Sequence, residues 1–169
     1  MKKMLILLAS LLPLTAMAGT ITMNAVNQSG VGEKLGTVTV TESEYGLVLT
    51  PNIRGLTPGL HGFHVHQNPT CMPKMKQGYW VAGLSAGSHY DPHKSGEHST
   101  AWGAGHLGDL PPLFVDASGH AVQPVLAPKL KISDLKGRAF MIHAGGDNHA
   151  DHPKKLGGGG ARAACGVIQ

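Results

Sequence analysis

Aromatic and charged side chains are scarce in this sequence, and both shortages exclude whole classes of protein. Only 5% of the 169 residues are Phe, Trp or Tyr, and only 14% are charged. This composition argues against a coiled coil and against a solvated helical array. The formal charge is +4, but Lys2 and Lys3 lie in a segment that we expect to be removed. The small positive excess that remains predicts no nucleic-acid partner.

Long hydrophobic runs are missing after the first 18 residues. Those residues are typical of a secretory signal peptide, because two lysines precede the apolar run Met4–Leu12 and Ala16-Met17-Ala18 is a cleavage signal. The apolar run is too short for a bilayer, which needs about 20 residues. We therefore expect residues 1–18 to be cleaved, residues 19–169 to form one domain, and the mature protein to have no membrane partner.

Cysteine is also scarce, since only Cys71 and Cys165 are present. Secretion implies an oxidising compartment, where a lone pair of cysteines forms a disulfide by default. One disulfide is therefore expected.

Glycine and proline, by contrast, are abundant. The 24 Gly and 11 Pro show no collagen period, so they favour a turn-rich β protein. Short runs of β-branched or alternating residues lie between Gly and polar turns, as strands do. Strands are expected at Ile21–Val26, Thr37–Thr41, Tyr45–Thr50, Gly62–Gln67 and Ala139–His143.

Two long stretches have little strand signal: Asn68–Pro112 and Ala144–Ala164. Between them we expect a hairpin over Val115–Val125 and one helical turn over Asp134–Gly137. Long irregular loops in a compact domain are usually functional. Nearly all the histidines fall in the two stretches or at their edges, so these stretches are the candidate functional loops.

The 11 histidines are the most unusual feature of the composition, and they point to metal. His64 and His66 are two residues apart. On a strand their rings share one face and are close enough to bind one metal together. An isolated pair of this kind would more often be two surface histidines, so the interpretation depends on the rest of the set.

A second cluster strengthens the metal interpretation. His98, His106 and Asp109 lie in a glycine-rich segment, and they suit zinc, which prefers four tetrahedral ligands. His89 and His143 bring the set to six histidines and one aspartate. Seven ligands fill two four-coordinate sites only if one imidazole binds a metal through each nitrogen. The residues alone leave open which histidine bridges.

The other five histidines are expected at the surface: His61, His93, His120, His149 and His152. His149 and His152 could instead form an auxiliary metal or pH-sensitive patch. Met72 and Met75 are soft ligands that Cu(I) would accept, although adaptable surface methionines are the other interpretation.

Two further groups also have two interpretations each. Tyr79 and Trp80 form either an exposed aromatic patch at a dimer interface or simple loop packing. Four lysines form either a positive rim for an anionic substrate or a solvated surface: Lys74, Lys76, Lys154 and Lys155.

Five motifs occur in order along the chain: His61-Gly-Phe-His-Val-His-Gln, Ser88-His-Tyr-Asp-Pro, Gly105-His-Leu-Gly-Asp-Leu-Pro, Met141-Ile-His-Ala-Gly-Gly-Asp-Asn and Leu156-Gly-Gly-Gly-Gly-Ala-Arg-Ala-Ala-Cys-Gly-Val-Ile. With them, essentially the whole mature chain resembles the bacterial periplasmic copper/zinc superoxide dismutases. The resemblance implies an all-β fold, an eight-stranded Greek-key β-barrel flattened like a sandwich, with two long functional loops. It also implies a periplasmic location.

The same resemblance implies one copper and one zinc ion per subunit. It gives copper the ligands His64, His66, His89 and His143, and zinc the ligands His89, His98, His106 and Asp109. His89 would then be the bridge.

Further roles follow from the resemblance. Asp147 would accept hydrogen bonds from His64 and His98, one ligand of each metal. Arg162 would attract and orient the anion beside copper, so Arg162 and His89 are the candidate catalytic residues. Cys71 and Cys165 would form the disulfide within the subunit.

The activity implied is the conversion of superoxide to dioxygen and hydrogen peroxide. A periplasmic copper-binding or copper-buffering protein is the alternative, but it would leave Arg162 and the zinc cluster unexplained. A zinc hydrolase needs an open position on the metal, which His89 would close. The family has both monomers and dimers, so a homodimer is one of two expected states.

Overall fold

Strands are the main regular elements of residues 17–169, the part of the chain that the computed structural model describes. In chain order they are β1 (Met17–Asn27), β2 (Gly30–Ser43), β3 (Gly46–Arg54), β4 (Gly59–His61), β5 (Phe63–His66), β6 (Lys74–Lys76), β7 (Tyr79–Val81), β8 (Leu113–Val115), β9 (His120–Ala121), β10 (Val125–Ala127), β11 (Arg138–His143) and β12 (Arg162–Ile168). The short helical turns are η1 (Leu84–Ala86), α1 (Ile132–Leu135) and η2 (Leu156–Gly158).

The predicted signal peptide, residues 1–18, lies outside the described residues except for its last two. Across residues 17–169, no helix is both long enough and apolar enough to cross a membrane.

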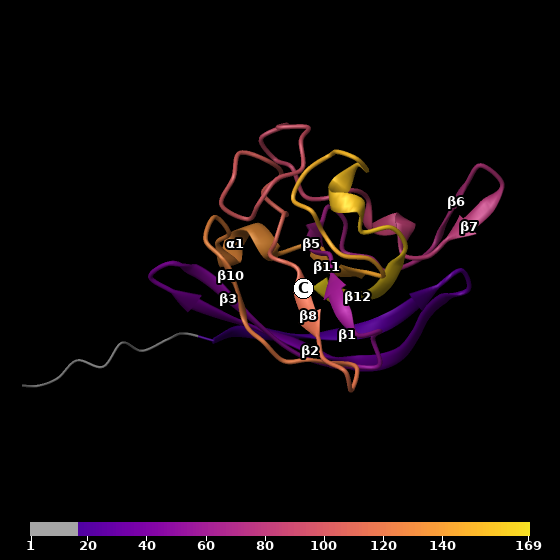
Figure 1. Cartoon of the computed structure of the whole chain (residues 1–169), viewed down its shortest axis with the longest axis horizontal. Coiled ribbons are helices and arrows are strands. Elements are labelled where there is room, and N and C mark those ends of the chain that lie inside the picture. The colour runs from indigo at the N-terminus through magenta and orange to yellow at the C-terminus, as the bar shows by residue number, and fades with distance from the viewer. Residues whose placement is uncertain (1–16) are drawn as a thin grey trace, which may run out of the picture.

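Eight strands form one curled antiparallel sheet (Figure 1). The hydrogen-bonded order is β10-β3-β2-β1-β12-β11-β5, and β9 also pairs with β3. β3 therefore lies beside strands from much later in the chain rather than beside β4, which is the kind of crossover that a Greek key requires. β4 pairs instead with β8 in a separate two-stranded ladder. The predicted all-β fold is confirmed.

Alternation of apolar and polar residues produces the first strands. In β2, Val38 and Val40 are buried, and in β3, Leu47 and Leu49 are buried, while their neighbours are more exposed. Successive side chains of a strand point to opposite faces, so each strand presents one apolar face to the core. β-Branched residues also suit this half-buried pleated surface.

The core lies directly under the strands that carry the histidines. Phe63 of β5 packs against Phe140 of β11, with ring centroids 5.2 Å apart, and both side chains are fully buried. Large buried aromatic side chains contribute strongly to packing. This contact holds β5 and β11 in a fixed relation, as their ladder from Ala139–His66 to Ile142–Phe63 also does.

Two long loops leave the sheet and lie on the same side of it (Figure 1). The first, residues 67–112, joins β5 to β8 and contains the β6–β7 hairpin and η1. The second, residues 144–161, joins β11 to β12 and contains η2. They match the two stretches expected from the sequence, except that the first contains a hairpin and that residues 162–164 of the second belong to β12.

Some elements differ from the sequence-based expectation. The turn at 116–119 is present, since the Gly119 amide donates to the Asp116 carbonyl. Its flanking strands pair elsewhere, however: β8 with β4, and β9 with β3. The helical turn lies at Ile132–Leu135 rather than at Asp134–Gly137. β12 was not predicted, because its first residues continue the glycine-rich run and its partners β1 and β11 are distant in sequence.

The predicted disulfide joins Cys71, in the first loop, to Cys165 on β12, across 94 positions. Both side chains are buried. The bond therefore ties the start of the first loop to the strand that begins at Arg162.

We predict that replacing both cysteines by serine lowers the free energy of unfolding of the metal-free protein by about 4–5 kcal/mol. In the chain-entropy model, closing a loop of this length removes that much from the unfolded state. Denaturant unfolding of oxidised wild type and of the double variant measures the difference. Equal unfolding midpoints and slopes would contradict the prediction.

Candidate metal centre

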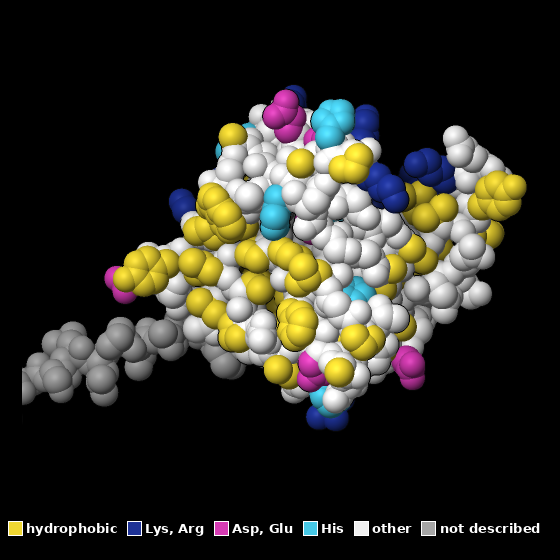
Figure 2. Space-filling model, in the orientation of Figure 1, with side chains coloured by type: hydrophobic (Ala, Val, Ile, Leu, Met, Phe, Trp, Pro, Cys, Tyr) yellow, Lys and Arg dark blue, Asp and Glu magenta, His cyan; other side chains and the backbone are white. Residues whose placement is uncertain are grey.

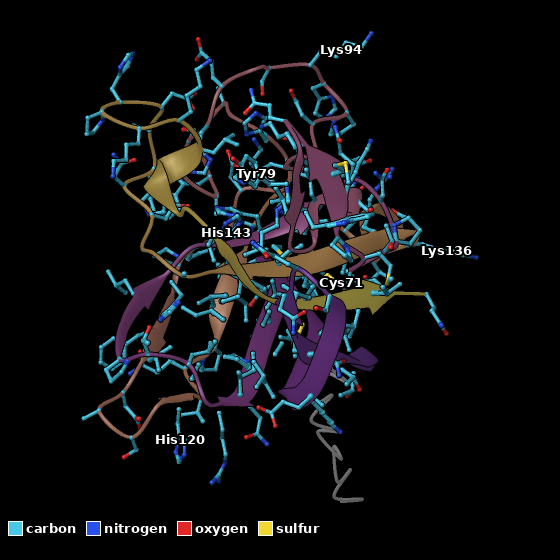
Figure 3. The ribbon with its side chains drawn as sticks, turned by 90° about the vertical axis from the view of Figure 1, so that its right-hand side faces the viewer. Cys71, Tyr79, Lys94, His120, Lys136 and His143 are labelled. Carbon is cyan, nitrogen blue, oxygen red and sulfur yellow. A yellow bond between two sulfur atoms is a disulfide. The ribbon has the colours of Figure 1, made fainter. Side chains whose placement is uncertain are left out.

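The side chains of four buried histidines converge beside strands β5 and β11. His64 and His66 lie on β5, His143 ends β11, and His89 comes from the first loop. A ligand-capable atom of each lies within 4.8 Å of those of the others. We call this set the four-histidine cluster. Figure 3 shows His143 near the middle of the molecule, between the loops and the sheet.

Backbone pairing places these side chains. An isolated bridge joins His66 to His89, which attaches the segment around His89 to the free edge of β5. The Tyr90 amide donates to the Val65 carbonyl at 2.8 Å, which continues this attachment. On the other edge of β5, Met141 of β11 pairs with His64. Three adjacent segments therefore bring the four rings together.

One nitrogen of each ring in this cluster is buried and has no hydrogen-bond partner among the described residues. These atoms are His64 Nδ1, His66 Nε2, His89 Nε2 and His143 Nε2. Buried polar atoms are normally paired, because an unpaired one costs free energy. Four such atoms in one place indicate that the site is built to hold something else.

The other nitrogen of three of these rings is a hydrogen-bond donor. His64 Nε2 donates to Asp147 at 2.7 Å, His66 Nδ1 donates to the Gly87 carbonyl at 3.0 Å, and His143 Nδ1 donates to the Gly160 carbonyl at 3.2 Å. A neutral imidazole with one nitrogen protonated has a lone pair on the other. The unpartnered nitrogens are therefore lone-pair donors suited to a metal ion.

A second set converges on one oxygen of Asp109. The Nδ1 atoms of His89, His98 and His106 lie 2.9, 2.9 and 3.2 Å from Asp109 Oδ1. All four side chains are buried. We call this set the Asp109 cluster; three nitrogens and one carboxylate oxygen are a ligand set typical of zinc.

His89 belongs to both clusters. Its Nδ1 faces Asp109, whereas its Nε2 is the unpartnered atom in the four-histidine cluster. The residues alone left open which ring is shared, whereas the resemblance implied His89, and the structure brings the His89 ring between the two sets. Its ring also stacks on His64, with centroids 3.8 Å apart.

Asp147 lies where the second loop crosses both clusters. Its Oδ2 accepts from His64 Nε2 at 2.7 Å, and its Oδ1 accepts from His98 Nε2 at 2.8 Å. The first contact fixes a ring of the four-histidine cluster, and the second fixes a ring of the Asp109 cluster. Burial alone would raise the pKa of Asp147, but the hydrogen bonds from His64 and His98 outweigh burial and hold that pKa well below its usual range.

Burial determines the charge of the four-histidine cluster. It lowers the pKa of His64 and of His66 well below the ordinary value, and the neighbouring His89 lowers both further. Burial likewise lowers the pKa of His143 to about 4. These rings are therefore neutral near pH 7, which is the form that binds metal.

The Asp109 cluster has the opposite electrostatic character. Burial would lower the pKa of His98, but hydrogen bonds with Asp109 and Asp147 overcome it and raise that pKa to about 9. The two carboxylates thus create a local potential that favours positive charge. The same potential favours a divalent cation at this cluster.

Arg162 forms part of the wall of a cavity of about 290 Å³ at the four-histidine cluster, which we call the Arg162 cavity. Its guanidinium donates to the carbonyls of Gly83 and Gly87. Other lining residues are His66, Val81, Leu84, Ser88, His89, His143, Lys155, Leu156, Gly160 and Ala161. A larger hollow of about 640 Å³ beside the disulfide is lined by no His, Asp, Glu, Lys or Arg side chain, so the chemistry lies in the smaller one.

The remaining histidines do not join either cluster. His93 and His152 are exposed, and His120 lies at the opposite end of the molecule (Figure 3). His149 is partly buried, 3.9 Å from Asp147 through its Nδ1. The expectation that His61 lies at the surface is wrong.

His61 is instead buried, with 2% of its surface exposed. Its Nδ1 lies 2.6 Å from the His143 carbonyl and its Nε2 lies 2.7 Å from the Thr57 carbonyl. It therefore joins the end of β11 to the loop before β4. The only signal in the sequence was its place in the first motif, two residues before Phe63.

Arg138 is a second residue whose place the sequence did not reveal. Its guanidinium lies 4.1 Å from the centroid of the Tyr90 ring, and it donates to the Gln67 carbonyl. Gln67 follows His66 and Tyr90 follows His89. A cation over an aromatic ring is stabilising. Arg138 therefore helps to fix the backbone next to His66 and His89.

We predict that Gly157→Ala weakens zinc binding by about 10–100-fold, the usual cost of losing a partner behind a metal ligand. A Cβ at Gly157 would overlap the Asp147 carboxylate and lie 2.7 Å from His98 Nε2. Competition with a zinc chelator measures the change.

Gly158→Ala is the matched control. Both glycines have a positive φ, 72° and 77°, so backbone strain is similar. A Cβ at Gly158 would meet only Lys154, at 3.6 Å or more. Equal zinc affinities in the two variants would show that the Asp147–His98 contact does not support the site.

Comparisons with known proteins agree with this geometry. The family model described as copper/zinc superoxide dismutase matches residues 34–168. The chain is 57% identical over 152 residues to a protein of Salmonella typhimurium named superoxide dismutase (Cu-Zn) 1, covering 89% of this chain and 86% of that one.

Two solved structures are also similar. The copper/zinc superoxide dismutase from Brucella abortus has a TM-score of 0.88 at 48% identity, and the monomeric copper, zinc superoxide dismutase from Salmonella enterica has a TM-score of 0.81 at 51% identity. Each comparison covers 89% of this chain and 99% of the other.

Proposed function

Because the chain belongs to the copper/zinc superoxide dismutase family, we propose that the four-histidine cluster holds its copper and the Asp109 cluster holds its zinc. The activity is the conversion of superoxide to dioxygen and hydrogen peroxide, with copper and zinc as cofactors. In this assignment His64, His66, His89 and His143 bind copper, His89, His98, His106 and Asp109 bind zinc, and His89 bridges the two ions.

The unpartnered nitrogens are the observation that carries the assignment. Four lone-pair nitrogens without protein donors fit copper, which accepts imidazole ligands. Copper, when bound, supplies the one-electron exchange with superoxide, whereas zinc has no accessible redox chemistry. The Asp109 cluster offers three nitrogens and one oxygen, with His89 as the fourth ligand. This set fits a four-coordinate zinc ion with no open position.

The chain's own residues perform three tasks at this site. The second nitrogens of His64, His66 and His143 are bound to Asp147 and to two carbonyls, which holds the rings in one orientation. His89 also lines the Arg162 cavity, so its Nε2 would hold a proton only while it is not bound to copper, and would then donate that proton to the departing peroxide. Arg162 attracts and orients the anion, because a guanidinium stays charged at physiological pH.

The lysines extend the positive region around the Arg162 cavity. Lys155 lines the cavity itself. Lys74 lies opposite Val81 in the β6–β7 ladder and so shares its face, and Val81 also lines the cavity. Figure 2 shows Lys and Arg side chains gathered where the second loop meets the hairpin. A positive rim raises the local concentration of a small anion.

A copper-buffering protein is the less favoured alternative. It would need the four-histidine cluster but neither the Asp109 cluster nor Arg162 in the cavity wall. Superoxide consumption separates the two functions. Protein loaded with both metals is expected to consume superoxide rapidly, and protein loaded with zinc alone is expected to be inactive; equal rates would contradict the assignment of redox chemistry to the four-histidine cluster.

We predict that Arg162→Glu lowers the rate constant for superoxide consumption by on the order of tenfold or more, and by clearly more than Arg162→Lys. The rate of the wild type should also fall as salt rises, because salt screens anion attraction. Arg54→Glu on β3 is the matched control, since it makes the same charge change away from the cavity. Equal rates for the Lys and Glu variants would remove the electrostatic role of Arg162.

For location, we propose that residues 1–18 direct the chain to the periplasm and are removed after Ala18. The disulfide supports an oxidising compartment. Gly19 pairs with Val40 inside β1, so cleavage leaves the ladder from that pair onward intact. The mass of the periplasmic protein should correspond to a start at Gly19; an uncleaved product would contradict this.

For assembly, we propose a homodimer that uses the β6–β7 hairpin. Tyr79 and Trp80 at its tip are 75% and 51% exposed, which favours an interface over loop packing. Exposed aromatic side chains of this kind favour protein contacts. Sedimentation velocity should show a concentration-dependent dimer that Trp80→Lys abolishes. A wild-type monomer at all concentrations would overturn the proposal.

A further inference from the structure

Asp151, in the second loop, joins two distant backbone segments through its two carboxylate oxygens. Its Oδ2 accepts from the His98 amide, 53 positions away, at 2.9 Å. Its Oδ1 accepts from the Leu156 amide at 2.8 Å. Charge-assisted hydrogen bonds from backbone N–H groups to a carboxylate are among the stronger kind.

The two donors belong to different parts of the metal centre. His98 is a member of the Asp109 cluster, and Leu156 lines the Arg162 cavity. The backbone of Leu156 is left-handed, with a φ of 56°. Leucine rarely adopts this conformation, so a contact that holds the Leu156 amide also holds a strained part of the cavity wall.

The second loop is otherwise held mainly by its own hydrogen bonds in this region. The Asn148 amide donates to the Gly157 carbonyl at 3.0 Å, and the Gly157 amide donates to the Ala150 carbonyl at 3.1 Å. Two carboxylates connect it to the first loop at His98: Asp147 through the ring and Asp151 through the backbone amide. Only the second of these also binds the cavity wall directly.

We propose that Asp151 is a positioning residue that couples the Asp109 cluster to the wall of the Arg162 cavity. When a cation fixes the position of His98, the two hydrogen bonds of Asp151 also restrict the motion of Leu156 and of the residues beside it. The cavity then keeps the shape that admits a small anion next to Arg162. This coupling rests on the zinc ligands proposed above.

If Asp151 only stabilised the second loop and did not couple it to zinc, the prediction would be different. Asp151 would then slow hydrogen exchange in the second loop by the same factor with and without zinc. Coupling instead makes the protection of the second loop depend on zinc, and makes that dependence require Asp151. The test therefore compares zinc-dependent protection, not stability.

The experiment is hydrogen–deuterium exchange of the full mature protein, free of copper, with and without zinc ion. In the wild type, zinc should slow exchange in residues 97–107 and also in residues 152–161. In Asp151→Ala, zinc should still slow exchange in 97–107 but should lose most of its effect on 152–161. Asp151→Asn retains one carbonyl oxygen as an acceptor and should fall between the two, and it provides the test if the alanine variant does not fold.

Asp116→Asn is the matched control. Asp116 Oδ1 also accepts two backbone amides, from Ser118 at 2.8 Å and from His120 at 2.9 Å. Figure 3 shows His120 far from His143 and the metal centre. This variant should behave as the wild type does in both segments.

Two outcomes would overturn the proposal, and they are distinguishable. If zinc protects 152–161 equally in Asp151→Ala and in the wild type, the coupling is wrong while the zinc assignment stands. If zinc does not protect 97–107 even in the wild type, the zinc assignment itself fails, and the coupling fails with it.

Discussion

Four imidazole nitrogens are kept buried, close together and without protein hydrogen-bond donors, and the metal centre depends on this arrangement. Each unpartnered polar atom costs about 1–3 kcal/mol in a protein interior. The fold offsets that cost with the packed core beneath, where Phe63 meets Phe140, and with the hydrogen bonds on the opposite sides of the rings. Those hydrogen bonds also set which nitrogen has the lone pair. A bound metal ion would give these four nitrogens the partner that the protein does not supply.

Sheet and loops divide the work. The sheet supplies three members of the four-histidine cluster from β5 and β11, whose relation is fixed by the ladder and the core. The first loop supplies the whole Asp109 cluster. Isolated bridges attach its His89 and Asp109 to β5, but they do not include His98 or His106. Carboxylates make up for this: Asp147 binds a ring from each cluster, and Asp151 binds the backbone behind one of them. The disulfide and Arg138 attach the first loop to β12 and β11.

The sequence predicted what depends on local pattern and on the ordered motifs. The alternation of Val38 and Val40 with polar residues predicted β2, and the motifs supplied the residues that converge in the two clusters. Prediction failed where a residue's role depends on a distant partner. β12 is a strand because β1 and β11 flank it, and His61 is buried because its acceptors are the His143 and Thr57 carbonyls. Spacing alone did not reveal that His89 is shared, because this depends on which nitrogen faces which cluster; the resemblance of the ordered motifs to the family implied it.

Anomalous X-ray diffraction from crystals of the copper- and zinc-loaded protein, at both metal edges, tests the central claim most directly. The account predicts a copper peak bound by the four unpartnered nitrogens, a zinc peak bound by the Asp109 cluster, and the His89 ring between them. A copper peak away from the four-histidine cluster, or two metals that share no ring, would contradict it.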